Sequence, residues 1–193
     1  MSSQTAWMIS LTLSLCAIIL AAGANSSTLH MAASGAVSLV LAILAVREHA
    51  HLTAAGAAKS VVGASTARYS GLIWAWGALG ILTYEFILDK QWPEWNQFFL
   101  GFMLAAAGCL LFANMLTKDA ATGKDDTSVL NLGRILVLVQ FIGMMVAAIT
   151  MLIDGKFPRS IEKPDWAACN IFFFGALSIA AISLNALISQ RRA

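Results

Sequence analysis

Six long apolar segments dominate the sequence and constrain its fold more than any other feature. They cover approximately residues 7–24, 29–46, 70–88, 95–116, 132–153 and 166–188. A helix of about 20 apolar residues crosses the ~30 Å hydrocarbon core of a bilayer, whereas helices in soluble cores seldom stay apolar for that length. Membrane β-strands are about 10 residues long with alternating polarity, and no segment alternates. The sequence therefore predicts an all-α, polytopic membrane bundle of about six transmembrane helices.

The composition agrees with this prediction. Charged residues make up 11% of the 193 residues and hydrophobic residues 59%, whereas a soluble domain has about 25% charged residues. Because the apolar segments take up most of the chain, we expect a single transmembrane domain over residues 1–193 with the lipid bilayer as its surroundings. The net charge of +2 is small, and it gives no indication of nucleic-acid binding.

The first segment raises the question of a cleaved signal peptide. Residues 1–6 contain no Lys or Arg, although the start of a secretory signal is normally positive. We therefore expect residues 7–24 to be a retained span.

Lys and Arg are distributed unevenly between the two sets of predicted loops. With a cytoplasmic N-terminus, eight fall on the cytoplasmic side: Arg47, Lys59, Arg68, Lys118, Lys124, Arg134, Arg191 and Arg192. Four fall on the opposite side: Lys90, Lys156, Arg159 and Lys163. Because cytoplasmic loops carry the excess of basic residues, the sequence predicts a protein of the bacterial inner-membrane type with both termini in the cytoplasm.

A weak internal repeat precedes the fourth and sixth segments. The sequence Trp92-Pro93-Glu94-Trp95 is matched by Lys163-Pro164-Asp165-Trp166, 71 residues later. Proline suits the first turn of a helix, a carboxylate complements the positive end of its dipole, and an indole favours the headgroup region. The pattern indicates helix starts at one membrane surface. It fits either a duplicated helix hairpin or independent capping of two helices.

The three histidines are candidate metal or haem ligands. His30 lies 19 residues from His49, or roughly 28 Å along a helix, so the two cannot share a haem. Glu48, His49 and His51 resemble a metal cluster only in composition, because His49 and His51 are two residues apart and ligands on one helical face need a spacing of three or four. We interpret them as solvated interfacial residues. The three cysteines lie inside apolar segments, and we expect neither a metal site nor a cofactor.

Glu85 is the only carboxylate predicted to lie within the hydrocarbon, one turn before Asp89. Intramembrane acids are costly and often functional. At this shallow depth we favour an outer polar cluster with His30 and Asp89 that serves structure. Neutral polar side chains provide a second candidate group, which either glues helices together or lines a path across the membrane. Its members are Asn114, Gln140 and Asn185, with Glu85 nearer the outside.

Aromatic side chains on the third segment offer a possible ring-binding surface. Trp74, Trp76 and Tyr84 could stack on a quinone or carotenoid. Aromatics near helix ends are more often anchors at the membrane interface, and we interpret these three in that way.

Small residues recur at positions i, i+4 and i+7 on the last three segments, which places them on one narrow helical stripe. Small stripes allow the close backbone approach on which helix association in lipid depends. The three stripes are Gly101, Ala105 and Gly108, then Gly143, Ala147 and Thr150, then Ala176, Ala180 and Ser183. We expect at least one of them to contact another subunit.

The sequence contains no phosphate-binding loop, nucleophile elbow, zinc-protease motif or redox cysteine pair, which are the motifs that would indicate an enzyme. The favoured hypothesis is a non-catalytic membrane protein acting by association, as an accessory or assembly subunit or as a homo-oligomer. A small transporter or channel with a neutral polar path is the alternative. A membrane cofactor or quinone binder is the third hypothesis.

Overall fold

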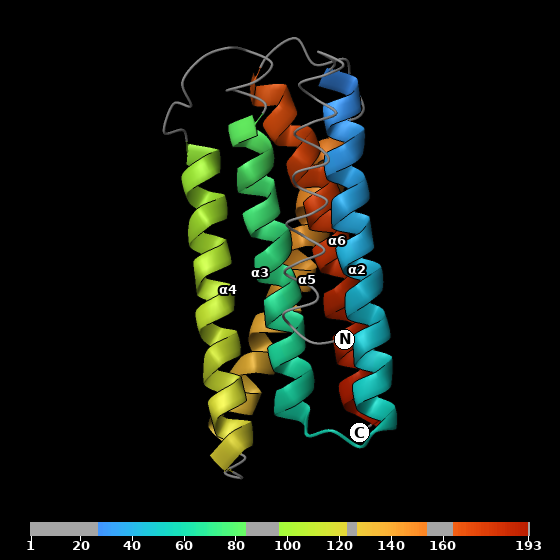
Figure 1. Cartoon of the computed structure of the whole chain (residues 1–193), viewed down its shortest axis with the longest axis vertical. Helices are drawn as coiled ribbons and strands as arrows, with labels where there is room; N and C mark the ends of the chain where they lie inside the picture. The colour runs from blue at the N-terminus through green and yellow to red at the C-terminus, as the bar shows by residue number, and fades with distance from the viewer. Residues whose placement is uncertain (1–26, 84–96, 123–126, 154–163, 193) are drawn as a thin grey trace.

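The computed structural model describes residues 27–83, 97–122, 127–153 and 164–192. These residues form five helices that run up and down in one bundle (Figure 1). Their bounds are α2 Ser27–Ala54, α3 Lys59–Thr83, α4 Gln97–Thr122, α5 Thr127–Ile153 and α6 Pro164–Arg192. The described part of the chain contains no strand, which confirms the all-α prediction there. The predicted span over residues 7–24 lies outside it, so the count of six spans stays a prediction.

Four of the described helices are long and apolar enough to cross a membrane. The qualifying segments are Gly35–Ala54, Phe99–Lys118, Arg134–Ile153 and Ile171–Ser189. These helices indicate a membrane protein. The described part of α3 does not meet the same criterion of length and hydropathy. Its position in the bundle makes this lower hydropathy tolerable. It packs against α2, α4, α5 and α6, so its polar side chains face protein rather than lipid.

The connection from α2 to α3 is short, because α2 ends at Ala54 and α3 begins at Lys59. Both helices extend beyond the apolar segments over residues 29–46 and 70–88. Gly56 has a φ of 67°. Its N–H donates to Thr53 O at 3.1 Å, and the Ala57 N–H donates to Leu52 O at 3.0 Å. This pair of bonds is a Schellman motif, which ends α2 sharply.

The core follows α3 along its length. One buried cluster joins α2, α3 and α6, and includes Leu41, Ile73 and Ile179. A second joins α3, α4 and α6 through Ile81 and Phe102 among others. Because both clusters use α3, this helix lies at the centre of the described bundle.

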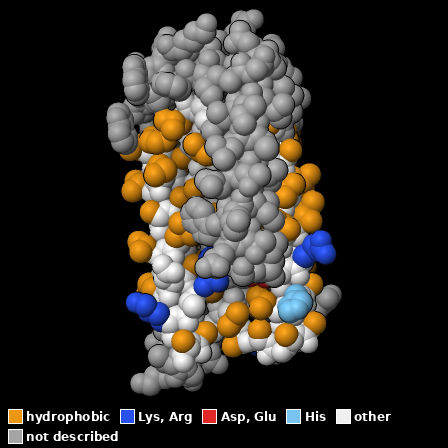
Figure 2. All heavy atoms as spheres, viewed as in Figure 1, with side chains coloured by type: hydrophobic (Ala, Val, Ile, Leu, Met, Phe, Trp, Pro, Cys, Tyr) orange, Lys and Arg blue, Asp and Glu red, His pale blue; other side chains and the backbone are white. Residues whose placement is uncertain are grey.

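Basic side chains gather at one end of the bundle, which we call the basic end. Its described members are Arg47, Lys59, Arg68, Lys118 and Arg134, at the end of α2, the start of α3, the end of α4 and the start of α5. All Lys and Arg side chains coloured in Figure 2 lie toward this end, with apolar flanks beyond them. The predicted clustering of these five residues on one side agrees with the structure. Which side faces the cytoplasm stays a prediction.

The repeat is only partly covered by the described residues. Helix α6 begins at Pro164, the position that the pattern assigned to a helix start. The matching residues 92–95 lie outside the described ranges, as does the side chain of Trp166. The duplication therefore stays a prediction.

Candidate functional site: a polar layer beside a lateral groove

Glu48 forms the first part of a polar layer between α2, α3 and α6. Its carboxylate Oε1 accepts a hydrogen bond from Ser65 Oγ at 3.0 Å. Its Oε2 accepts another from the Tyr69 hydroxyl at 2.9 Å. Ser65 and Tyr69 are four residues apart on α3, so one helical stripe presents both donors to the acid. Both donors are buried and Glu48 is half-buried.

His49 forms the second part and is fully buried, with 0% of its surface exposed. The Thr66 hydroxyl donates its hydrogen to Val62 O at 2.9 Å. It must therefore accept in its 3.2 Å contact with His49 Nε2. Asn185 Nδ2 lies 2.9 Å from His49 Nδ1 and can donate to it. These roles fit a neutral imidazole that carries its proton on Nε2.

Gln140 continues the polar layer from α5. Its amide Nε2 donates to Ser70 Oγ at 2.9 Å and to Ser183 Oγ at 3.1 Å. One amide therefore links α5 to both α3 and α6. Ser70 and Ser183 are buried, whereas Gln140 is half-buried and borders a groove. Ser70 lies one turn beyond Thr66 on α3, so the two parts of the layer are adjacent.

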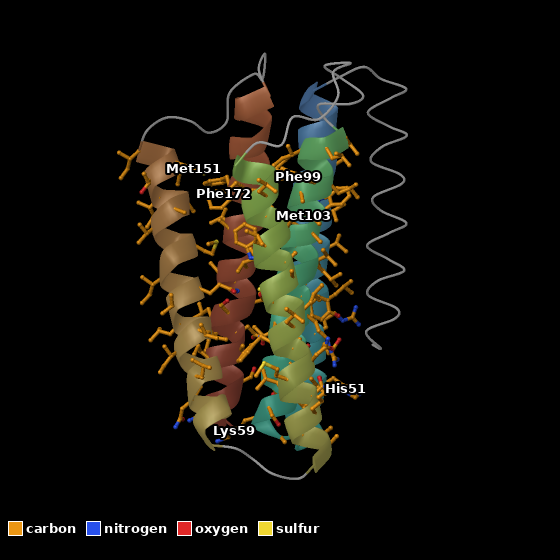
Figure 3. All side chains as sticks on the ribbon, turned by 90° about the vertical axis from the view of Figure 1, so that its left-hand side faces the viewer. His51, Lys59, Phe99, Met103, Met151 and Phe172 are labelled. Carbon is orange, nitrogen blue, oxygen red and sulfur yellow. The ribbon has the colours of Figure 1, made fainter. Side chains whose placement is uncertain are left out.

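A groove of about 670 Å³ runs beside this layer, between α4 and α5. It exists because α4 packs closely on α3 and α5 packs mainly on α6, while α4 and α5 make at most marginal contact with each other. The floor is α3, which contributes Thr66, Ser70 and Trp74. Figure 3 shows α5 standing apart from α4, with side chains between the two helices. The volume lies within the 300–1,000 Å³ that is typical of small-molecule sites.

The walls of this lateral groove are mostly apolar and include small residues. Ala105 and Gly108 of α4 line it, and a Cβ added at Gly108 would meet nothing within 4 Å. Leu111 and Val139, on the rim, are exposed. The groove is therefore open on its outer side, where a bilayer would bring lipid or another helix.

The two ends of the groove differ in chemistry. Trp74 marks one end, where its ring contacts Phe102 and Phe172 with centroids 5.2 and 5.8 Å apart. Lys59 and Arg134 line the groove toward the basic end. In Figure 3, Lys59 and Phe172 lie toward opposite ends of the bundle. The groove thus runs from an aromatic cluster, past polar floor groups, to two cations.

The neutral polar residues that were predicted to act together do not all lie together in the structure. Gln140 and Asn185 join the polar layer, whereas Asn114 is exposed on α4. Glu85 and Asp89 lie outside the described residues, as does the side chain of His30. The outer polar cluster therefore stays a prediction.

The three predicted small-residue stripes differ in burial. Ala176, Ala180 and Ser183 are buried inside the bundle, so the stripe on α6 faces other helices of this chain. The stripes on α4 and α5 are half-buried or exposed. Open space surrounds the Cβ positions of Gly101, Gly108 and Gly143. The described helices therefore leave the stripes on α4 and α5 at least partly uncovered.

Two interpretations of interfacial residues were wrong. His49 was expected to be solvated, but it is buried against α3 and α6. Trp76 was expected to anchor at the membrane interface, but only 3% of its surface is exposed and it belongs to the core. The first error arose because the prediction used only the spacing within α2. The partners of His49 are Thr66 of α3 and Asn185 of α6, which lie 17 and 136 residues further along the chain. Repeated hydroxyl residues on α3, at Ser65, Thr66 and Ser70, were the signal that could have indicated a polar interior.

Among the described residues, no group of three or more His, Cys, Asp or Glu side chains is arranged to hold a metal ion. Cys109 is a free, half-buried thiol on the groove wall. The residues that line the groove offer hydrogen bonding, apolar contact, positive charge and one thiol.

The chain matches no protein-family model, no curated protein and no solved structure at a significant level.

Proposed function

We propose that this membrane protein binds one amphiphilic molecule, which enters the lateral groove between α4 and α5 from the bilayer. The observation that carries the proposal is a half-enclosed apolar groove with polar groups on its floor. Lipid-facing surfaces of membrane helices are normally apolar throughout, and polar groups within the membrane mark binding sites or paths. Gln140, Thr66 and Ser70 supply such groups on one side of the groove.

The polar layer behind the groove supports a binding role over simple packing. The polar groups of a protein orient a bound ligand only if their own positions are fixed. Thr66 is held by Val62 and His49, and Gln140 is held by Ser70 and Ser183. The site is thus preorganised by contacts among four helices. Binding of this kind suits a carrier or a lipid-regulated protein, and it requires no catalytic group.

A volume change inside the groove tests this function. Ala105 lines the groove and Ala107, on the same helix, is exposed and does not line it. The two side chains point about 200° apart, which makes Ala107→Leu a matched control for Ala105→Leu. We expect Ala105→Leu to reduce the amphiphile retained through mild detergent purification, as measured by mass spectrometry of extracts. Ala107→Leu should retain the wild-type amount. Equal retention by all three proteins would contradict the proposal.

Association with another membrane subunit is the second candidate function. Specific support comes from α5, whose apolar outer surface is largely uncovered by the described helices, with Ile142, Val146 and Ile153 all more than half exposed. The open space at Gly143 would allow close approach of a second helix. Native mass spectrometry from membranes should then detect a homo-oligomer or a heteromeric complex that Ala147→Leu weakens. A strictly monomeric, partner-free protein would exclude this candidate.

A further inference from the structure

We infer that the amphiphile is an anionic phospholipid of the surrounding bilayer, with its phosphate held by Lys59 and Arg134 and one acyl chain in the groove. This inference rests on the proposed function and adds the class of ligand. The two cations line the same groove from different helices, Lys59 from the start of α3 and Arg134 from the first third of α5. Basic pockets between transmembrane helices are characteristic sites for anionic lipid headgroups.

The charge of the groove favours an anion over a zwitterion. None of the described lining residues is acidic. Glu48, a described carboxylate close to the basic end, accepts its hydrogen bonds from Ser65 and Tyr69 rather than from a cation. Arg134 contacts the neutral Asn131 at 3.4 Å. The positive charge of Lys59 and Arg134 is therefore uncompensated by any described carboxylate in the groove.

The distance between the two ends of the groove fits an extended acyl chain. Lys59 and Trp74 are 15 residues apart on α3, which corresponds to about 22 Å of helix. That length exceeds half of the ~30 Å hydrocarbon thickness, so the floor between these two residues is long enough for an acyl chain from one leaflet to lie along it. The open outer side leaves room for the second chain to remain in the bilayer.

The test compares lipid preference in purified protein. Delipidated protein is incubated with an equimolar mixture of phosphatidylglycerol and phosphatidylethanolamine that have identical acyl chains. The bound lipids are then quantified by native mass spectrometry. Lys59→Gln and Arg134→Gln are compared with Arg47→Gln and Lys118→Gln, which remove exposed cations of the basic end that do not line the groove. Each cation near a membrane surface strengthens anionic-lipid binding about fivefold.

We expect the wild-type protein to prefer phosphatidylglycerol. Each groove variant should lower that preference about fivefold and the double variant about 25-fold, while the two control variants keep it. Equal binding of both lipids by wild-type protein would overturn this inference and leave the proposed function standing. Equal losses in groove and control variants would also overturn it, because general surface charge would then explain the preference. If wild-type protein retains neither lipid, both this inference and the proposed function fail.

Discussion

The substitution Gly77→Ala provides a sharp test of the packing between α3 and α4. A Cβ at this position would lie 2.7 Å from Phe102 Cδ2 and 2.9 Å from Phe102 Cε2. These distances are shorter than carbon atoms tolerate, so the ring or the helix must shift. The Phe102 ring has little freedom, because it is buried and contacts Trp74 and Phe172. Overpacking of a filled core typically costs about 1–3 kcal/mol.

Gly101→Ala is the matched control, since a Cβ there would meet nothing within 4 Å. Both variants gain the same ~0.5–1 kcal/mol from replacing a helical glycine, so this term cancels in their comparison. We therefore expect Gly77→Ala to unfold with a free energy about 1–3 kcal/mol lower than Gly101→Ala, as measured by denaturant titration in one detergent. In a Phe102→Ala background the difference should largely disappear. Equal stability of the two single variants would refute the close approach of α3 and α4.

Three further results are expected from changes elsewhere in the chain. Asn185→Ala should lower the free energy of unfolding by about 1–2 kcal/mol in the same titration, because it leaves a buried imidazole nitrogen without its partner; unchanged stability would contradict that contact. Glu48→Ala should destabilise the protein more than Glu48→Gln, because the amide keeps an oxygen that accepts one of the two hydrogen bonds; the reverse order would show that the carboxylate is not bonded in this way. Reporter fusions after Ser27, Gln91 and Ser160 should all report the exterior, and a cytoplasmic signal at Gln91 would overturn the six-span topology.

Properties that depend on local apolar length could be predicted from the sequence. The segment over residues 132–153 corresponds to α5, Thr127–Ile153, and the segment over residues 166–188 to α6, Pro164–Arg192. Length and polarity along the chain decide whether a segment can cross a bilayer, so no knowledge of neighbours was needed. The shared position of Arg47, Lys59 and Arg134 at one end follows from the alternation of helix direction.

The start of α3 could not be predicted in the same way. Its first turns contain Ser60, Gly63 and Ser65, which would be unfavourable in a helix exposed to lipid. They are tolerated because α2, α4 and α6 surround α3 and replace lipid with protein contacts. Only the tertiary arrangement supplies that information.

The candidate site was predictable only in fragments. Gln140 and Asn185 were singled out because amides inside apolar segments are unusual, and both belong to the polar layer. The role of His49 and the lateral groove depend on contacts between helices far apart in sequence. Whether a small-residue stripe is exposed or buried depends on the neighbouring helices, which the sequence does not place. Gly108 faces open space, for example, whereas Ala180 is buried.

Photochemical cross-linking with a lipid that carries a reactive group in its acyl chain tests the lateral groove most directly. Native membranes containing this lipid would be irradiated, and the labelled peptides of the protein mapped by mass spectrometry. We predict that labelling concentrates on the groove faces of α4 and α5, around Cys109 and Gln140, and that Ala105→Leu reduces it while Ala107→Leu does not. Labelling spread evenly over all exposed helical faces, and unaffected by Ala105→Leu, would contradict a lipid-binding groove.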